Sequence, residues 1–436
     1  MTTGTPDSTA SGPVSTSDPR GGAADSPHAR PTAELELEAL RESIAFDLPA
    51  YLADLESLVN IDCGSYTPEG VDEVGRWTAT FLGQLGAEID VRPDPSGRYG
   101  KTVVATFHGK ADGPRVLLIG HMDTVFDAGT AAARPFRIDD GIAYGPGVTD
   151  MKSGLLAGLY ALKSIVAEFD GLPFERLTFI ANPDEEVGSP SSRDHIRGAA
   201  ADVDVCLVLE CARANGDIVS ARKGILDTRL TVHGRAAHAG VEPEKGRSAI
   251  LEAARVVRDL HALNGRWPGV TVNVGKIAGG TRPNVVAERC ELEVDVRSTS
   301  AEGLAEVESV IRELVETTEV PDTTIDANVL VSWLPMEKLA RSDRLAEHAK
   351  AIAERLGFTI NDTATGGASD ANTTSGMGVP SLDGLGPVGG NDHAPAEYLD
   401  VESIVPRTTL LAGLLLAIAR DPEVLAWRSD DPRFQG

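Results

Sequence analysis

Residues 115–123 read Arg-Val-Leu-Leu-Ile-Gly-His-Met-Asp, an apolar run that stops at a histidine and an aspartate. Two later stretches have the same form: residues 177–186 read Leu-Thr-Phe-Ile-Ala-Asn-Pro-Asp-Glu-Glu, and residues 205–210 read Val-Cys-Leu-Val-Leu-Glu. Short apolar runs of this kind are typical of strands buried on both faces of a sheet. Because ligands bind beyond the carboxyl ends of strands in open α/β sheets, we expect these polar residues to meet at one rim of the sheet.

Strand-like and helix-like segments alternate on either side of these runs, which predicts an α/β fold with a mainly parallel sheet. The stretch 151–169 carries apolar residues at helical spacing, and a second apolar helix is expected at 405–419. The candidate strands of the main sheet are 101–107, 115–119, 177–181 and 203–209.

A different pattern occupies residues 223–332. Its predicted elements are, in order, strand 226–232, helix 248–262, strand 270–277, strand 289–297, helix 302–317 and strand 324–331. This β-α-β-β-α-β order is that of a ferredoxin-like unit, which folds as a domain of its own. We therefore expect a small domain inserted into a larger one made of residues 34–222 and 333–436. Residues 1–33 have almost no large apolar side chains and are expected to form a flexible tail.

Composition and net charge indicate which kinds of molecule the protein is not expected to bind and where it is expected to be located. The chain has 436 residues, enough for two domains, and its formal net charge of −26 disfavours nucleic acids and anionic membrane surfaces. No run approaches about 18 continuous apolar residues, and the first residues lack the apolar core of a secretory signal, so a cytoplasmic location is expected. Four cysteines without a CxxC pair are expected to be reduced and mostly buried: Cys63, Cys206, Cys211 and Cys290.

The polar residues at the predicted rim are of the kinds that bind zinc. Asp150 ends the sequence Gly-Pro-Gly-Val-Thr-Asp just before the helix at 151–169, and His393 ends the loop Gly-Gly-Asn-Asp-His. Histidine and carboxylate ligands without thiolate suit zinc or a similar cation. Acids crowded onto one rim would repel each other, and divalent cations remove that repulsion.

Two short spacings indicate separate tasks for neighbouring residues. His121 and Asp123 point to the same face of an extended segment, so Asp123 is expected to accept the second ring N–H of His121 and fix its orientation. The adjacent residues Glu185 and Glu186 point in different directions, so one can bind metal while the other faces the substrate.

Taken together, three motifs resemble those of the dinuclear zinc aminoacylase/carboxypeptidase family of metallopeptidases, and they look most like bacterial glutamate carboxypeptidase. They are His-Met-Asp-Thr-Val at 121–125, Gly-Pro-Gly at 145–147 followed by Asp-Met-Lys-Ser-Gly at 150–154, and Asp-Glu-Glu-Val-Gly-Ser at 184–189. The resemblance extends from about residue 35 to about residue 426 and includes the inserted domain.

This resemblance implies two Zn²⁺ ions per subunit, with Co²⁺ or Mn²⁺ as other possibilities, and a cis peptide bond after Asp150. It places His121 with Glu210 on one ion and Glu186 with His393 on the other, bridged by Asp150. Glu185 matches the general acid/base of the family, and Asp123 is counted with the catalytic residues. The family also uses its inserted domain for dimerisation, which implies a homodimer.

In such a dimer the resemblance implies that His238, in Gly-Arg-Ala-Ala-His-Ala-Gly, reaches the partner subunit's site and stabilises the developing oxyanion. The carboxylate of the substrate would be bound by Arg297, by Asn284 and by backbone N–H groups around Gly366. Many relatives carry an arginine after the inserted domain, but this chain reads Ser-Trp-Leu-Pro-Met at 332–336. An apolar or aromatic amino acid packing near Trp333 is therefore as compatible with the sequence as glutamate.

Three functions remain open from the sequence. The first is a carboxypeptidase that releases a C-terminal amino acid by cleaving the amide bond next to a free carboxylate. The second is a deacylase of N-acyl amino acids, because both reactions need the same metal centre and the same carboxylate site. The third is a binding protein of the same fold without catalysis, which the intact set of candidate ligands and Glu185 disfavours.

Overall fold

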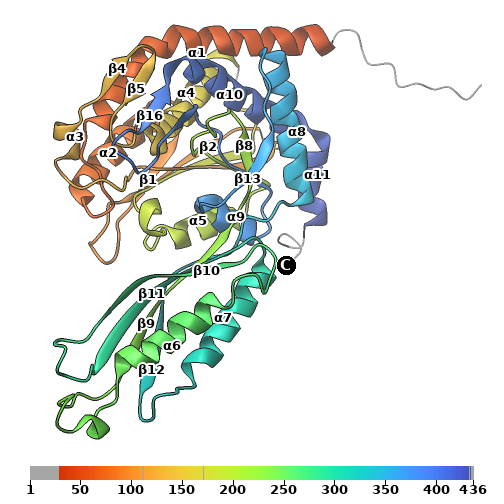
Figure 1. Ribbon diagram of the computed structural model, residues 1–436. Coiled ribbons are helices and arrows are strands. Elements are labelled where there is room, and N and C mark those ends of the chain that lie inside the picture. Colours follow the sequence, from red (N-terminus) through yellow and green to blue (C-terminus); the bar gives the residue numbers. More distant parts are fainter. Residues whose placement is uncertain (1–28, 111, 170, 432, 434–436) are drawn as a thin grey trace, which may run out of the picture.

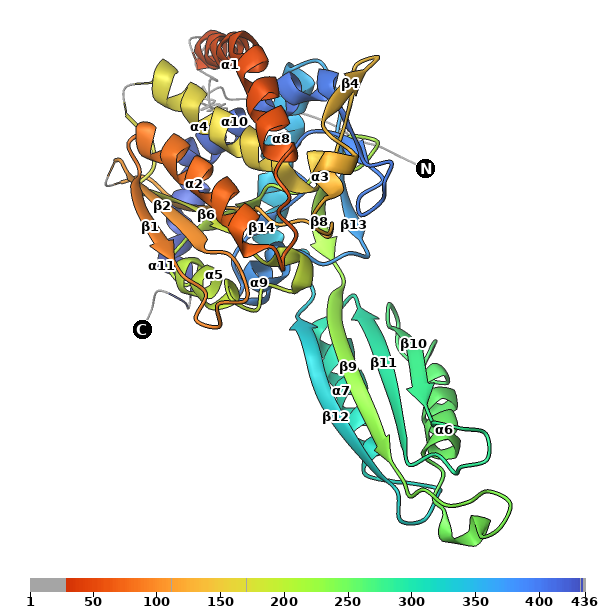
Figure 2. The same ribbon diagram turned by 90° about the vertical axis from the view of Figure 1, so that its left-hand side faces the viewer.

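The computed structural model describes residues 29–110, 112–169, 171–431 and 433. Most of the predicted tail, residues 1–28, lies outside these described residues. The first helix, α1 (Ala29–Val59), already includes positions 29–33, which the sequence analysis assigned to the tail. Figures 1 and 2 show a larger domain from which a smaller, elongated domain projects.

The larger domain is built on a six-stranded sheet with the strand order β1-β2-β6-β3-β7-β14. The strands β6, β3, β7 and β14 pair in parallel, whereas β1 and β2 join the edge in antiparallel fashion. The predicted mainly parallel sheet is therefore present. The strands are β1 (Glu88–Arg92), β2 (Thr102–His108), β3 (Arg115–His121), β6 (Arg176–Asn182), β7 (Val205–Val208) and β14 (Ser381–Leu382).

Helices cover both faces of this sheet because its central strands are apolar on both sides. In β3, Val116 and Leu118 belong to the core beneath α1, α2, α4, α8 and α10, whereas Leu117 and Ile119 belong to a second core beneath α5 and α9. The result is a three-layer α/β/α arrangement. The helices are α2 (Pro68–Gln84), α4 (Ser153–Glu168), α5 (Arg193–Ala200), α8 (Ala340–Arg355), α9 (Asp370–Gly376), α10 (Ile404–Arg420) and α11 (Pro422–Asp430).

The helix α10, with the turn before it, is long and apolar enough to cross a membrane by length and composition alone. Its most apolar window, within Val401–Arg420, has a mean hydropathy of 1.5. However, 72% of that window is buried inside the protein, where α10 packs against α1, α4 and α8. It is the central helix of the larger core, at the position predicted for the last apolar helix.

Two smaller sheets, which the sequence analysis did not predict, shape the loops near the rim. One has the order β15-β16-β5-β4, and the other pairs β13 with β8 in parallel. Because β16 pairs with β5, the loop between β15 and β16 lies beside the turn that follows β5. The elements are α3 (Thr130–Ala133), β4 (Arg137–Asp139), β5 (Ile142–Tyr144), β8 (Ile218–Arg222), β13 (Asp362–Thr365), β15 (Gly389–Gly390) and β16 (Tyr398–Asp400).

The smaller domain, called the lid here, is an antiparallel sheet in the order β10-β11-β9-β12 with two helices on one face (Figure 2). Ser248 and Ser300 cap its helices by accepting hydrogen bonds from Leu251 N and Gly303 N. The chain order β-α-β-β-α-β and the sheet order are those of the predicted ferredoxin-like unit. The elements are β9 (Gly224–His233), α6 (Ala249–His261), β10 (Thr271–Gly279), β11 (Arg289–Ser298), α7 (Ala301–Val315) and β12 (Thr324–Trp333).

Two neighbouring chain segments connect the lid to the larger domain. Arg222 and Met336 exchange both backbone hydrogen bonds, each 3.0 Å long. The side-chain amide of Asn372, on α9, donates to the carbonyls of Lys223 (3.0 Å) and Leu334 (2.8 Å), one on each segment. The lid has its own hydrophobic core. Two adjacent chain segments, called the hinge here, connect it to the larger domain, and Asn372 of α9 binds both of them.

Candidate active site

The carboxyl ends of three parallel strands and two loops deliver polar side chains to one rim of the main sheet. His121 is the last residue of β3, Glu210 follows β7, and Glu185 and Glu186 lie in a short 3₁₀ turn after β6. Asp150 lies in the turn before α4. His393 comes from the loop between β15 and β16.

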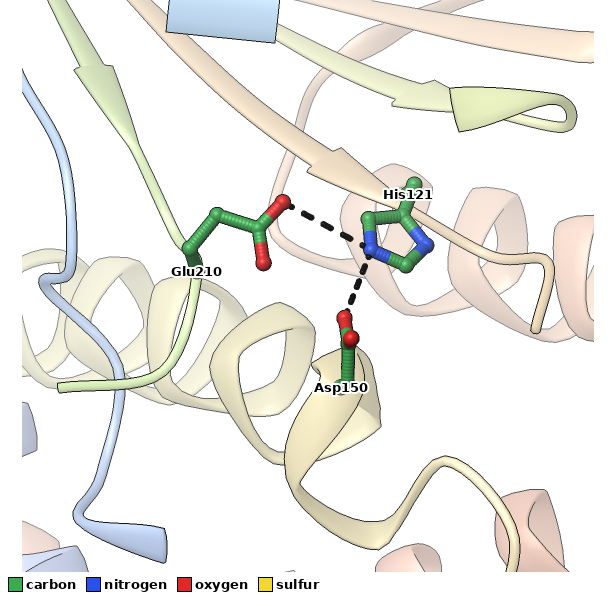
Figure 3. A group of neighbouring side chains, drawn as sticks. All are labelled: His121, Asp150 and Glu210. Carbon is green, nitrogen blue, oxygen red and sulfur yellow. Dashed lines mark hydrogen bonds and ion pairs between the residues drawn. The ribbon is translucent and has the colours of Figure 1, made fainter. Parts of the chain in front are cut away.

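The five predicted metal ligands form two groups that share Asp150. Nε2 of His121 lies 3.1 Å from Oδ1 of Asp150 and 3.6 Å from Oε1 of Glu210 (Figure 3). Nε2 of His393 lies 3.1 Å from the other oxygen of Asp150, Oδ2, and 3.1 Å from Oε2 of Glu186. In each group of three, the possible ligand atoms lie within 4.8 Å of one another. One carboxylate thus faces both groups, one oxygen to each.

The donor set fits a pair of divalent cations. Oε1 of Glu186 is buried without any hydrogen-bond partner, so one carboxylate oxygen in the group is left unsatisfied. Burial raises the pKa of Glu186 to about 7 and that of Glu210 to about 8, and repulsion from Asp150 adds to both shifts. Cations at the two groups would satisfy the free oxygen and favour the ionised carboxylates.

Thiols take no part in this centre. All four cysteines are free and buried, as predicted from their spacing, and they are Cys63, Cys206, Cys211 and Cys290. Within the part of the chain that the structure describes, both groups of possible ligands consist of histidine and carboxylate side chains only. This ligand chemistry suits zinc, cobalt or manganese better than a thiolate-preferring metal.

Glu185 is buried beside the two ligand groups but belongs to neither. Burial raises its pKa well above the ordinary value; His121 opposes this shift, and the carboxylates of Glu210 and Glu186 add to it. A buried carboxylate with a raised pKa next to a metal centre is suited to accepting and returning a proton.

Asp123 contacts both His121 and the turn that carries Glu185 and Glu186. Its backbone carbonyl, rather than the predicted carboxylate, makes the shorter contact with the ring of His121. Nδ1 of His121 donates to the backbone carbonyl of Asp123 at 3.0 Å, while the Asp123 carboxylate lies farther away, at 3.4 Å. That carboxylate also accepts hydrogen bonds from Ser65 Oγ (2.6 Å) and from the backbone N–H groups of Glu185 and Glu186 (3.2 Å each). It therefore orients both the histidine and the turn that carries the paired glutamates.

Glu397 is a site residue that sequence reasoning missed. Its carboxylate is 1% exposed and accepts hydrogen bonds from the backbone N–H groups of Gly147 (2.8 Å), Thr149 (2.9 Å) and Asp150 (3.0 Å). Burial raises its pKa to about 7, although these three bonds oppose that shift. Because Glu397 lies in the same loop as His393, it ties two ligand-bearing loops together. The peptide bond after Asp150 in this turn is cis, as the resemblance implied.

His238 and Asn284 lie together, but at the end of the lid away from the hinge. The main chains of the two loops are joined where Ala239 N donates to Asn284 O, and Gly240 N donates to the ring of His238. Because β9 starts at the hinge and spans ten residues, its far end lies about 30 Å away. Within one chain, these two residues are therefore not brought to the metal ligands.

The other predicted substrate contacts are nearer the hinge. Arg297 pairs with Ile225 across the hinge end of the lid sheet, and its guanidinium binds Asp295 through Nε (2.8 Å) and Nη2 (2.7 Å). Gly366 is exposed in the loop before α9, with open space where a side chain would be. Trp333 is only 7% exposed and lies beneath Arg193, so little of its ring faces open space.

Comparisons with known proteins agree with this geometry. Residues 117–417 match Peptidase family M20/M25/M40. The chain is 29% identical over 371 residues to carboxypeptidase G2 of a Pseudomonas species, covering 84% of this chain and 89% of that protein. It is 24% identical over 392 residues to acetylornithine deacetylase of Edwardsiella ictaluri, covering 84% and 97%.

Among solved structures, an aminopeptidase from Bacillus cereus shares the fold with a TM-score of 0.69 and 24% identity, over 86% of this chain and 99% of that one. This likeness supports the α/β fold. The family match extends over more than half of the chain, from β3 through most of α10. The chain therefore belongs to Peptidase family M20/M25/M40 and is an α/β metallohydrolase.

Proposed function

We propose that this hydrolase cleaves an amide bond next to a free carboxylate, in a small peptide or an N-acyl amino acid, with two divalent cations held at the rim. The observation that carries the proposal is the position of Asp150, whose two carboxylate oxygens face two separate ligand groups. Zn²⁺ is the expected ion, with Co²⁺ and Mn²⁺ as the alternatives that the same ligands accept. His121 with Glu210 would hold one ion, and Glu186 with His393 the other.

When bound, the two cations would polarise the scissile carbonyl and lower the pKa of the attacking water. Glu185 is then placed to accept the proton of that water and to pass it to the leaving nitrogen. A raised pKa favours the first of these transfers, because a more basic carboxylate accepts a proton more readily. Asp123 holds the backbone of Glu185 so that its side chain stays directed at the centre.

The proposal includes a homodimer in which His238 of one subunit serves the rim of the other. His238 is exposed and lies at the far end of its own lid, so a second copy is needed to bring it to a metal centre. The lid also offers a surface for pairing: β10 is an edge strand with β11 as its one sheet neighbour among the described residues. Exposed apolar side chains lie on α6 and on β10, at Ile250, Leu251 and Ile277.

Arg297 and the backbone around Gly366 of one subunit are proposed to bind the substrate carboxylate together with Asn284, which, like His238, would have to come from the second copy in the dimer. Asp295 engages Nε and one side of Nη2 of Arg297, which leaves both N–H groups of Nη1 and one of Nη2 as donors for a substrate carboxylate. No arginine occupies residues 332–336, so a neutral side chain on the released amino acid is a candidate equal to glutamate. Carboxypeptidase action is the first candidate, and N-acyl-amino-acid deacylation is the second, because curated relatives include a deacetylase that aligns over 97% of its length.

The test is a substrate panel with enzyme freed of metal by chelation and then reloaded with Zn²⁺, Co²⁺ or Mn²⁺. The panel pairs dipeptides with N-acetyl derivatives of the same C-terminal amino acids: glutamate, leucine, phenylalanine and lysine. We expect turnover that requires metal, saturates at two ions per subunit and is lost when the carboxylate is amidated. Absence of turnover by every reloaded form, or equal turnover of the amidated substrates, would contradict the proposal.

A further inference from the structure

Arg193, the first residue of α5, contacts both the active-site turn and the lid. Its Nη2 donates to the carbonyl of Gly188 at 2.6 Å, and its Nη1 donates to the carbonyl of Ser332 at 3.0 Å. Its guanidinium carbon also lies 5.5 Å from the ring centroid of Trp333. Gly188 belongs to the larger domain, whereas Ser332 and Trp333 end the last lid strand, β12. One side chain therefore joins the two domains.

The turn that Arg193 holds is the one that carries the proposed proton acceptor. Gly188 closes the turn that begins at Glu185, since Gly188 N donates to Glu185 O at 2.8 Å. Gly188 has a φ of 90° and no side chain, and Val331 of the lid fills the adjacent space: a Cβ on Gly188 would lie 3.1 Å from it. Residues Val331 and Ser332 of β12 therefore lie against the end of the Glu185 turn, directly or through Arg193.

The Glu185 turn is held from two sides. Asp123 accepts from the backbone N–H groups at its start, and Arg193 donates to the carbonyl at its end. Asp123 belongs to the larger domain alone, so its hold does not depend on the lid. Arg193 is different, because its second hydrogen bond and its stacking partner both lie in the lid.

The contact also lies on the lid side of the hinge. Asn372 clamps the hinge at Lys223 and Leu334, whereas Arg193 binds Ser332, beyond this clamp along the chain toward the lid. If the lid rotated about the hydrogen bonds of Asn372, the distance between Arg193 and Ser332 would therefore change. The guanidinium makes its hydrogen bonds to main-chain carbonyls, and the planar fork allows both at once.

We propose that Arg193 is a positioning residue that couples the orientation of the lid to the placement of the Glu185 carboxylate. The hydrogen bonds of Arg193 go to main-chain carbonyls rather than to the metal ligands, so it would act through the Gly188 carbonyl and β12. The inference rests on the proposed role of Glu185. Loss of the fork should allow the lid to adopt a wider range of orientations and the turn to shift, and a displacement of about 1 Å at a reacting group can cost up to about 10²-fold in rate.

The test compares Arg193→Met with Arg197→Met. Arg197 is on the same helix, one turn further on, and is exposed, with only a 3.8 Å contact to the exposed carboxylate of Asp194. Spin labels on Glu306→Cys in α7 and Glu354→Cys in α8, both exposed, report the distance between lid and larger domain. Because the four native cysteines are buried, the labels are directed to the introduced positions.

We expect Arg193→Met to broaden the distance distribution and to lower kcat about tenfold while metal content stays at the wild-type value. Arg193→Lys should recover part of both effects, since an ammonium can reach one or both carbonyls without the fixed fork. Arg197→Met should match the wild type in both measurements.

Either effect without the other would overturn the coupling: an unchanged distance distribution with a lowered kcat, or a broadened distribution with wild-type kcat. The same holds if Arg193→Met matches Arg197→Met throughout. If Arg193→Met folds poorly, Arg193→Lys carries the comparison alone, with the same two measurements. A wild-type enzyme without turnover would instead refute the proposed function, and the distance measurement would still report whether Arg193 holds the lid.

Discussion

The rim of the main sheet and the far end of the lid both carry candidate catalytic residues. Folding of one chain brings the rim residues together, but it does not bring the lid residues to a metal centre. At the rim, five side chains from strand ends and loops converge within one chain, and Asp150 faces both ligand groups. At the far end of the lid, the loops of His238 and Asn284 lie next to each other, and neither residue belongs to a ligand group found among the described residues. One region is completed by folding, whereas the other is proposed to be completed by association.

The positions of the rim residues and of His238 are determined in different ways. Strand ends determine where the rim residues lie, so the rim follows from the topology of a single chain. The position of His238 relative to a metal centre depends on how two copies pair.

Glu185→Gln tests the rim at its proposed proton acceptor. The amide has the same shape but cannot accept the proton of water, so kcat should fall about 10²–10⁴-fold while both metal ions remain bound. Stopped assays and metal analysis of the same samples check this. The matched control is the neighbour Glu186→Gln, which should lose metal because Glu186 lies in a ligand group. A Glu185→Gln enzyme with more than a tenth of wild-type kcat would remove Glu185 from this role.

His238→Ala tests the far end of the lid. Loss of one oxyanion donor should lower kcat about 10²–10³-fold without changing metal content. Mixing this variant with Glu185→Gln should restore activity, because a mixed dimer contains one rim with Glu185 served by a partner with an intact His238. With random pairing the recovery is about a quarter of wild-type activity. Two inactive variants that remain inactive after mixing would contradict a site shared between subunits.

Glu397→Gln tests whether the rim depends on a residue that binds no metal. A glutamine has one oxygen to share among three N–H donors and places an NH₂ group against at least one of them, so the Asp150 turn should loosen. We expect metal affinity to fall about 10–100-fold, measured by competition with a chelator, with a smaller loss of kcat at saturating metal. Glu402→Gln, an exposed acid in the next turn, is the control and should bind metal normally.

The metal-ligand candidates could be predicted because most of them adjoin a recognisable feature of the sequence. His121, Glu186 and Glu210 come at or soon after apolar runs, and Asp150 precedes a strongly periodic helix. The lid elements were predicted within a few residues for the same reason, since its strands alternate and its helices are amphipathic. In these cases the local pattern and the final contacts agree.

Residues that act on main-chain atoms could not be predicted in this way. Glu397 binds the backbone of residues 147–150, and Arg193 binds the carbonyls of Gly188 and Ser332, so no side-chain pairing marks them in the sequence. The Asp123 carboxylate lies 3.4 Å from the ring of His121, near the predicted partner, but its hydrogen bonds from the backbone N–H groups of Glu185 and Glu186 were not predicted. The short strands of the two smaller sheets, such as β15 with two residues, are too short for a periodic signal.

The smallest effect is expected away from both regions, at Asp421, whose pKa is lowered, unlike those of the rim glutamates Glu185, Glu186 and Glu210. Burial alone would raise the pKa of Asp421, but hydrogen bonds from Arg344 and His348 and from the amide of Glu423 hold it below its ordinary value. A carboxylate with a depressed folded-state pKa stabilises the fold above its ordinary pKa of about 3.9. That contribution is lost as the pH falls from there toward the folded-state pKa.

Asp421→Asn keeps the size of the side chain and its ability to cap α11, but removes the charge. In metal-free protein we expect a Tm about 2–4 °C below wild type at pH 7. The difference should shrink below about pH 4, because protonation then removes the same charge from the wild type. Asp430→Asn, at an exposed position on the same helix, should leave Tm unchanged at both pH values. A deficit for Asp421→Asn that stayed constant with pH would mean that packing or hydrogen-bond geometry, rather than the charge of Asp421, stabilises this end of the molecule.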